Sequence, residues 1–129
     1  MWLVLVMPEM FAVGMHHYKH RSLSINQRLK ISREPNNPYD KFACSCIDES
    51  GEKLAYLDRS SARSISSIID TNIPNGPVYI KAKFEPNVKN KRKGPQQKCS
   101  VAIKISENQK EHVEQFLKLR GIPFYYHKK

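Results

Sequence analysis

The sequence predicts a mainly β protein with two helices, in which about six short antiparallel strands close into a small barrel. Most of its apolar segments alternate with a period of two residues, which is typical of strands with one buried face. Short turns rather than long crossovers connect most neighbouring segments, which favours antiparallel pairing. The 129 residues fit one domain, large enough to bury a core without disulfides.

Six strands are expected, and the alternation of apolar residues assigns their faces. They span residues 10–18, 27–33, 41–47, 52–57, 78–84 and 98–105, with a hairpin turn at 48–51. The apolar stretch 1–7 is expected to form a further strand or an N-terminal flap. The side chains expected to point inward are Leu29, Ile31, Phe42, Cys44, Cys46, Val78, Ile80, Ala82, Phe84, Val101, Ile103 and Ile105.

Two segments change to helical spacing. Residues 60–70 place Ala62, Ile65, Ile68 and Ile69 on one side, behind a serine suited to cap the first turn. A second helix, at about 107–120, follows the capping box "SENQ" that begins at Ser106. Its expected inner face holds Val113, Phe116, Leu117 and Arg120, and Gly121 and Pro123 end it. We therefore expect one domain over 1–129, with a core at about 11–105 and a short basic tail.

The charge of the chain favours a polyanion as partner. Lysine and arginine number 22 against 12 acidic residues, which gives a formal net charge of +10. The cations gather at 16–33 and 81–98, whereas acidic residues gather at 40–58. In the loop "KNKRKG", we expect Lys91, Arg92 and Lys93 to contact backbone phosphates; the alternative is a solvated loop without a ligand. The same loop also fits a nuclear localisation signal.

The patterns of the common catalytic sites are missing from the sequence. It has no glycine-rich phosphate loop, no G-x-S-x-G and no paired carboxylates suited to magnesium, so a small nuclease or metal-dependent hydrolase is the weaker interpretation. Three cysteines favour a reducing, intracellular compartment and buried thiols over a zinc site. We expect no metal and no cofactor. The longest apolar run, residues 1–7, is too short to span a bilayer.

The segment "REPNNPYDKFA", residues 33–43, predicts a rigid loop. Two prolines fix backbone angles, and asparagine and aspartate side chains favour tight turns. The loop presents Tyr39 beside Asp40, a ring that stacks on a base and a carboxylate that accepts a hydrogen bond from a hydroxyl group. A strand end has a 3′-hydroxyl where the interior has a phosphate, so this pair suits an end. In the alternative, Asp40 caps the turn and Tyr39 packs.

This segment, followed by "DESGEKLAYLDRSSARSISSIID" and preceded by "AVGMHHY", resembles the HIRAN domain family. The family signature is R-x-P-x-N-P-Y-D-x-x-A, and the resemblance covers about 11–105. It implies a small OB-like barrel that binds single-stranded DNA by capturing a 3′-hydroxyl end. By resemblance, Asn37, Tyr39 and Asp40 belong to the pocket, Tyr39 stacks on the terminal base and Asp40 receives the hydroxyl.

Several positions depart from the best-understood member of the family. His16 and His17 stand where an arginine and a tyrosine are expected, and Tyr18 keeps one aromatic ring. Tyr56 replaces a histidine, and Arg59 keeps the basic position that follows. Ala55 replaces a glycine, and Gln97 stands where an aromatic residue is expected. We nevertheless include His16, His17, Tyr18, Tyr56 and Arg59 among the candidate DNA-binding residues.

The sequence therefore predicts a non-enzymatic nucleic-acid-binding module that binds single-stranded DNA at a 3′-hydroxyl end. A protein-interaction module, with the same barrel and its basic loop docked on an acidic partner, is the alternative. The resemblance further implies a role in DNA repair, beside a larger helicase or nuclease assembly. We expect a monomer, not associated with membranes, that is nuclear if the source is eukaryotic.

Overall fold

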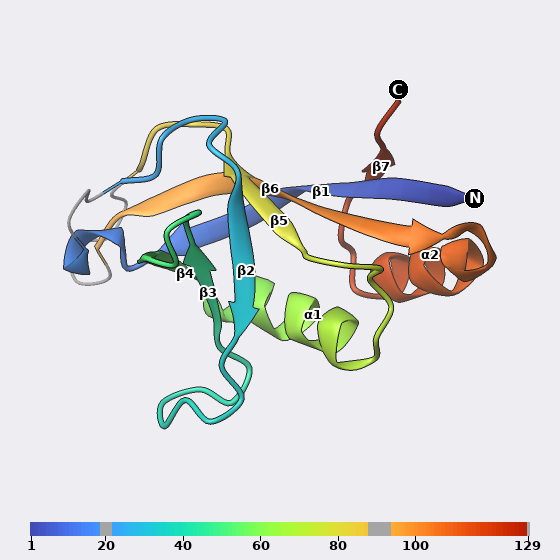
Figure 1. The fold of residues 1–129 in the computed structure, drawn as a ribbon, viewed down its shortest axis with the longest axis horizontal. Coiled ribbons are helices and arrows are strands. Elements are labelled where there is room, and N and C mark those ends of the chain that lie inside the picture. The colour runs from blue at the N-terminus through green and yellow to red at the C-terminus, as the bar shows by residue number, and fades with distance from the viewer. Residues whose placement is uncertain (19–21, 88–93, 129) are drawn as a thin grey trace.

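A single curved sheet closes into a barrel in the computed structural model, which describes residues 1–18, 22–87 and 94–128 (Figure 1). The strand order is β4-β3-β2-β5-β6-β1-β7, and an additional pairing of β4 with β1 closes the first six strands on themselves. All strand pairings are antiparallel. The strands are β1 (Trp2–Val13), β2 (Leu29–Arg33), β3 (Cys44–Ile47), β4 (Lys53–Leu57), β5 (Tyr79–Ala82), β6 (Gln96–Ser106) and β7 (Tyr125–Tyr126).

Strand β1 pairs with three other strands, β4, β6 and β7. It pairs with β6 along nearly its whole length, from Trp2–Ser106 to Val13–Gln96, with an irregularity between Met7 and Met10. On its other edge, its C-terminal end pairs with β4 and its middle pairs with β7. The expected barrel of six antiparallel strands with two helices is therefore confirmed, and β7 is an addition outside it.

The helical elements are η1 (Met15–His17), α1 (Arg59–Asp70), η2 (Glu107–Gln109) and α2 (Lys110–Leu119). Helix α1 lies below the barrel in Figure 1 and buries Ala62, Ile65 and Ile68. Helix α2 buries Val113 and Leu117, and the predicted capping box at Ser106 is present. No helix within the described ranges is long and apolar enough to cross a membrane.

The core is formed by the inward faces of the strands and the apolar sides of the helices. Its largest fully buried apolar side chains are Leu5, Met7, Met15, Leu29, Ile65, Ile68, Ile80, Ile103, Ile105, Leu117 and Val101. The predicted inward residues of β2 and β6 are all buried, as are Val78, Ile80 and Ala82 at β5. The period-two alternation therefore identified most of the core correctly.

Some predicted elements were wrong in their bounds. The first strand does not reach Tyr18, because Gly14 adopts a left-handed backbone (φ 77°) and the chain turns into η1. Residues 1–7 form the first half of β1 rather than a flap. Phe84 is 58% exposed because β5 ends at Ala82, and Phe42 precedes β3 and is only half-buried.

The residue that caps α1, the exposure of Arg120 and the structure of the C-terminal tail also differ from the expectation. Asp58, not a serine, caps α1, because its carboxylate accepts a hydrogen bond from the backbone N–H of Ser61. Arg120 is exposed rather than part of the inner face of α2. The aromatic tail packs as β7, where the Tyr126 hydroxyl donates to Glu114 at 2.5 Å.

All three cysteines are buried, as predicted, and all are free thiols. Burial raises the pKa of Cys44 and of Cys99 to about 12 and also raises the pKa of Cys46. Cys44 and Cys99 contact the carbonyl oxygens of Phe42 and Gln97, respectively. In the described part of the chain, no three His, Cys, Asp or Glu side chains gather into a group suited to a metal ion.

The cysteines of β3 give a test of core packing. Cys46→Ser should lower the free energy of unfolding by about 1–3 kcal/mol, because it buries a hydroxyl that needs a partner. Cys44→Ser should cost less, since the Phe42 carbonyl is in place to accept the new hydroxyl. Urea denaturation of the two variants measures the difference. Equal losses, or stoichiometric zinc in the purified protein, would contradict this view of the core.

Candidate functional site

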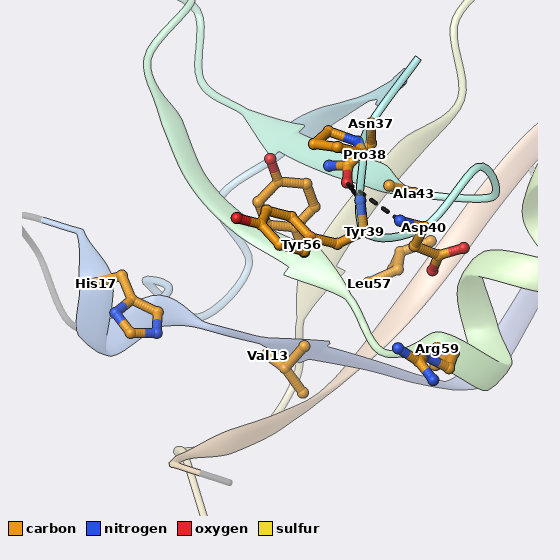
Figure 2. Close-up of a pocket in the computed structure, with 10 residues that line it drawn as sticks. All are labelled: Val13, His17, Asn37, Pro38, Tyr39, Asp40, Ala43, Tyr56, Leu57 and Arg59. Atoms are coloured by element: carbon orange, nitrogen blue, oxygen red, sulfur yellow. Dashed lines mark hydrogen bonds between the residues drawn. The ribbon is translucent and has the colours of Figure 1, made fainter. Parts of the chain in front are cut away.

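A cleft of about 660 Å³ opens at the seam where β4 pairs with β1 (Figure 2). It combines five parts of the chain: the end of β1, η1, the loop before β3, the end of β4 and the start of α1. Its lining residues are Val13, His17, Asn37, Pro38, Tyr39, Asp40, Ala43, Tyr56, Leu57 and Arg59. The cleft therefore contains six of the residues that the sequence proposed: Asn37, Tyr39, Asp40, His17, Tyr56 and Arg59.

Asn37 holds the loop in shape through the hydrogen bonds of its side-chain amide. Its Oδ1 accepts hydrogen bonds from the backbone N–H groups of Tyr39 and Asp40, at 2.9 Å and 3.2 Å. Its Nδ2 donates to Oε1 of Glu34 at 3.1 Å. Because both ends of the amide are engaged within the protein, Asn37 shapes the pocket, and its neighbours are the groups that face a ligand.

Tyr39 and Asp40 differ in how they are held. The Tyr39 side chain is 91% exposed, so the alternative in which it packs is not what the structure shows. Asp40 does stabilise the turn, because its Oδ1 accepts the backbone N–H of Phe42 at 2.9 Å. The hydrogen bonds of its carboxylate to described residues use Oδ1 alone, which leaves Oδ2 to accept from a ligand.

Glu34, which no pattern in the sequence indicated, connects this loop to β4. Its Oε2 lies 2.7 Å from Nζ of Lys53, and its Oε1 accepts from the Tyr56 hydroxyl at 2.9 Å as well as from Asn37. Lys53 also donates to the Tyr56 oxygen at 2.7 Å. Burial favours a higher pKa for Glu34, but the donors Lys53, Asn37 and Tyr56 outweigh it and hold the pKa at about 2.

Arg33 fastens the other side of the loop, to α1. Its Nε and Nη2 donate to the two carboxylate oxygens of Asp70, both at 3.0 Å, and its Nη1 donates to the carbonyl of Ala43 at 3.0 Å. The Arg33 guanidinium lowers the pKa of Asp70. Glu34 and Ala43 also share a backbone hydrogen bond of 2.9 Å. The loop 34–43 is therefore closed at its base and tied to both β4 and α1.

The opposite wall of the cleft carries His17 and Arg59. Figure 2 shows His17 on η1 and Arg59 at the start of α1, on separate sides of the apolar floor formed by Val13. Arg59 is exposed, and among the residues that the structure describes it forms no salt bridge. Its charge is therefore available to an anionic ligand in the cleft.

Two of the proposed binding residues, His16 and Tyr18, lie beside the cleft and are not among its lining residues. The His16 ring lies against that of His17, with the ring planes tilted by 41° and the centroids 3.9 Å apart. The backbone at Gly94 (φ 72°) approaches the His16 ring so closely that a Cβ there would overlap it. Tyr18 lies against Tyr56, and burial together with Tyr56 raises its pKa. The proposed phosphate contacts Lys91, Arg92 and Lys93 lie outside the described residues.

Gln97, the residue at the expected aromatic position, has a structural role. It is fully buried, and its Oε1 accepts from the Leu23 backbone N–H at 2.9 Å. Its Nε2 donates to the carbonyls of Leu23 and Phe84, at 2.8 Å and 2.9 Å. One amide therefore joins the chain before β2 to the chain after β5, a function that an aromatic ring does not provide.

The sequence matches the HIRAN domain family over residues 6–106. Helicase-like transcription factors from Oryctolagus cuniculus and Mus musculus are 33% and 31% identical to it over 61 residues. Each match covers 47% of this chain but only 6% of the relative, so the chain spans a small part of the length of these curated relatives.

Solved structures show the same fold. The crystal structure of the HIRAN domain of human HLTF superposes with a TM-score of 0.69 at 20% identity, over 92% of this chain and 93% of that one. The NMR structure of the HLTF HIRAN domain in its DNA-bound conformation gives a TM-score of 0.62 at 22% identity, over 86% and 84%. Since the family match spans well over half of its length, this chain belongs to the HIRAN domain family.

Proposed function

We propose that this domain binds single-stranded DNA and receives a 3′-hydroxyl end in the cleft. One observation carries the proposal: the exposed Tyr39 and the Asp40 carboxylate line the same cleft, as neighbours on a loop held in place by Asn37. The DNA-bound conformation of the related HLTF domain supports nucleic acid as the class of ligand. The net charge of +10 supports it as well.

The two side chains take different roles in this proposal. The Tyr39 ring stacks on the terminal base, which needs an aromatic face open to solvent. The Asp40 carboxylate accepts a hydrogen bond from the terminal hydroxyl, and it repels a phosphate at the same place. Arg59 and His17, at the edges of the cleft, contact the phosphates that precede the end.

The cleft is preformed in this proposal, which reduces the entropy lost on binding. Glu34 joins the loop to Tyr56 through Asn37 and the Tyr56 hydroxyl, so the ring of Tyr56 is oriented before DNA arrives. The Tyr56 hydroxyl is engaged with Glu34 and Lys53, and Nζ of Lys53 also lies 4.8 Å from the centroid of the Tyr56 ring. Tyr56 therefore offers DNA the other face of its ring rather than a hydrogen bond. This arrangement fits a stacking contact on the wall next to Tyr39.

A binding module of this kind recruits or protects a DNA end and leaves catalysis to its partners. The match to helicase-like transcription factors supports a helicase or nuclease assembly as its context. We propose that it acts as a monomer within such an assembly, in the nucleus of a eukaryotic cell. Association of a purified helicase or nuclease with this domain on DNA tests that context separately from the cleft.

Discrimination between DNA ends tests the cleft directly. The protein should bind an oligonucleotide with a 3′-hydroxyl roughly tenfold or more tightly than one with a 3′-phosphate, because a charge-assisted hydrogen bond contributes about 1.5–3 kcal/mol. Asp40→Asn should remove this preference more than it removes binding. Tyr39→Ala should weaken both ends by about 1–3 kcal/mol, the contribution of one stacked base.

The control for stacking is Tyr125→Ala, which removes a half-exposed tyrosine on β7, outside the cleft lining. It should leave both affinities unchanged when they are measured by fluorescence anisotropy. Equal binding of the two ends by the unaltered protein would show that the loop is a structural turn and would end the proposal.

The Glu34 network predicts a defined loss of stability in acid. Its folded-state pKa of about 2 lies below the usual 4.5, so its contribution is complete above about pH 4.5 and disappears as the pH falls towards 2. Glu34→Gln should therefore lower the free energy of unfolding at pH 7 by about 2 kcal/mol and change it less at pH 3. Urea denaturation at both pH values measures this, with Glu52→Gln as an exposed control. The same loss at both pH values would mean that the charge of Glu34 is not responsible.

A further inference from the structure

A second surface lies across the barrel from the cleft. Going round the closed sheet from β4, strand β5 is three strands away in either direction, through β3 and β2 or through β1 and β6. The cleft opens at the seam of β4 and β1, so the outer side of β5 faces away from it. Figure 1 shows β5 between its neighbours β2 and β6.

The register of these three strands determines which side chains point outward. Leu29, Ile80 and Val101 are buried and lie opposite one another, so the alternate positions point to the outer side of the barrel, where Ser100 is itself largely covered. Those positions pair Lys30 with Tyr79 and Lys81 with Ser100. A backbone hydrogen bond of 3.1 Å from Lys83 to Lys98 continues the pairing beyond β5. We name the outward cations the β5 face; they are Arg28, Lys30, Lys81, Lys83, Lys98 and Lys104.

Aromatic rings lie beneath half of these cations. The Arg28 guanidinium lies 4.3 Å from the centroid of Tyr79. Lys98 lies 5.7 Å from the centroid of Phe84, and Lys104 lies 5.5 Å from that of Trp2. A ring attracts a cation without neutralising it and leaves its N–H donors free to face a ligand.

Few acidic groups compensate the β5 face. Glu9 lies 3.9 Å from Lys98, at the limit of an ion pair, and Asp48 and Glu49 line a depression together with Arg28. Glu85 follows Phe84 at another edge and is exposed. Lys83 donates to the amide oxygen of Asn26 at 3.0 Å. The centre of the face, at Lys30 and Lys81, forms no salt bridge with any described residue.

We propose that the β5 face binds the phosphate backbone of double-stranded DNA, independently of sequence, while the cleft on the other side is free for a strand end. Alternate residues of a strand are about 6–7 Å apart and neighbouring strands about 4.8 Å apart, which gives a two-dimensional array of cations that suits closely spaced phosphates. At the centre of the face, the ring of Tyr79 lies under the Arg28 guanidinium, and Tyr79 is only partly exposed. The more exposed rings, Trp2 and Phe84, lie at the edges of the face. The centre therefore offers phosphate contacts without an open ring for base stacking, which fits an intact duplex better than single-stranded DNA.

The test uses DNA that has no end for the cleft, a covalently closed dumbbell duplex. Lys30→Gln, Lys81→Gln and Lys83→Gln together should weaken dumbbell binding roughly tenfold and reduce the salt slope by about three units, one for each lost phosphate contact. The control removes the same charge from exposed lysines at the other end of the fold, with Lys110→Gln, Lys118→Gln and Lys128→Gln. It should weaken dumbbell binding less than threefold.

The outcomes separate this proposal from that of the cleft. The β5 variant should keep its preference for a 3′-hydroxyl, and Asp40→Asn should keep dumbbell affinity, so either proposal can fail alone. Equal losses in the β5 variant and its control would show that net charge, not this face, binds the duplex, and would overturn the inference. Binding of polyglutamate or of phosphatidylserine vesicles that depends on the β5 lysines and that the dumbbell does not displace would assign the face to an acidic protein or a membrane instead.

Discussion

Glu34 places one carboxylate among three donors that come from different parts of the chain. Lys53 and Tyr56 belong to β4, and Asn37 belongs to the loop that carries Tyr39 and Asp40. Removing a carboxylate from water costs several kcal/mol unless its oxygens are satisfied, and here both oxygens are. The position of the loop over β4, and with it the cleft, therefore depends on this contact.

The same contact explains how a loop rich in proline and asparagine remains in one conformation. Local hydrogen bonds from Asn37 and Asp40 define the turn, but they do not orient it relative to the barrel. Glu34 orients it towards β4, and Arg33 orients it towards α1 through the bidentate contact with Asp70. Neighbouring residues in the sequence thus connect the loop to two different elements, and the cleft lies between them.

Much of the fold followed from the sequence because strand pairing and burial leave a local pattern. The alternation around Ile80 and Val101 identified buried positions that the structure confirms. The same pattern failed at Phe84, since alternation continues for two residues after the last paired residue of β5 and carries no signal for where pairing stops. At Gly14, the left-handed turn that ends β1 offered a signal in the glycine itself.

The site was predictable only in part, because contacts between residues far apart in the sequence leave no local pattern. The residue types in "NNPYD" indicated a tight turn with an exposed tyrosine, because proline and asparagine act on their own backbone. Glu34 and Lys53 gave no such indication: they are 19 positions apart, and only the pairing of β3 with β2 and β4 brings them together. At Gln97 the sequence indicated only a missing aromatic ring, although a buried amide at that position joins two segments by three hydrogen bonds.

A carboxylate at the proposed binding site of a protein with a net charge of +10 can be understood from the distances over which the two electrostatic effects act. The surplus of lysine and arginine attracts any polyanion over about 8–10 Å at physiological salt, without regard to which part of the strand arrives first. Asp40 acts over a few ångströms, at the cleft that it lines, where a single charge has its largest effect on the nearest group of a ligand. Attraction at long range and rejection at short range therefore do not cancel. In the binding mode that we propose, a phosphate is drawn to the surface and is kept from Asp40, and a hydroxyl is the group of a DNA strand that satisfies both conditions.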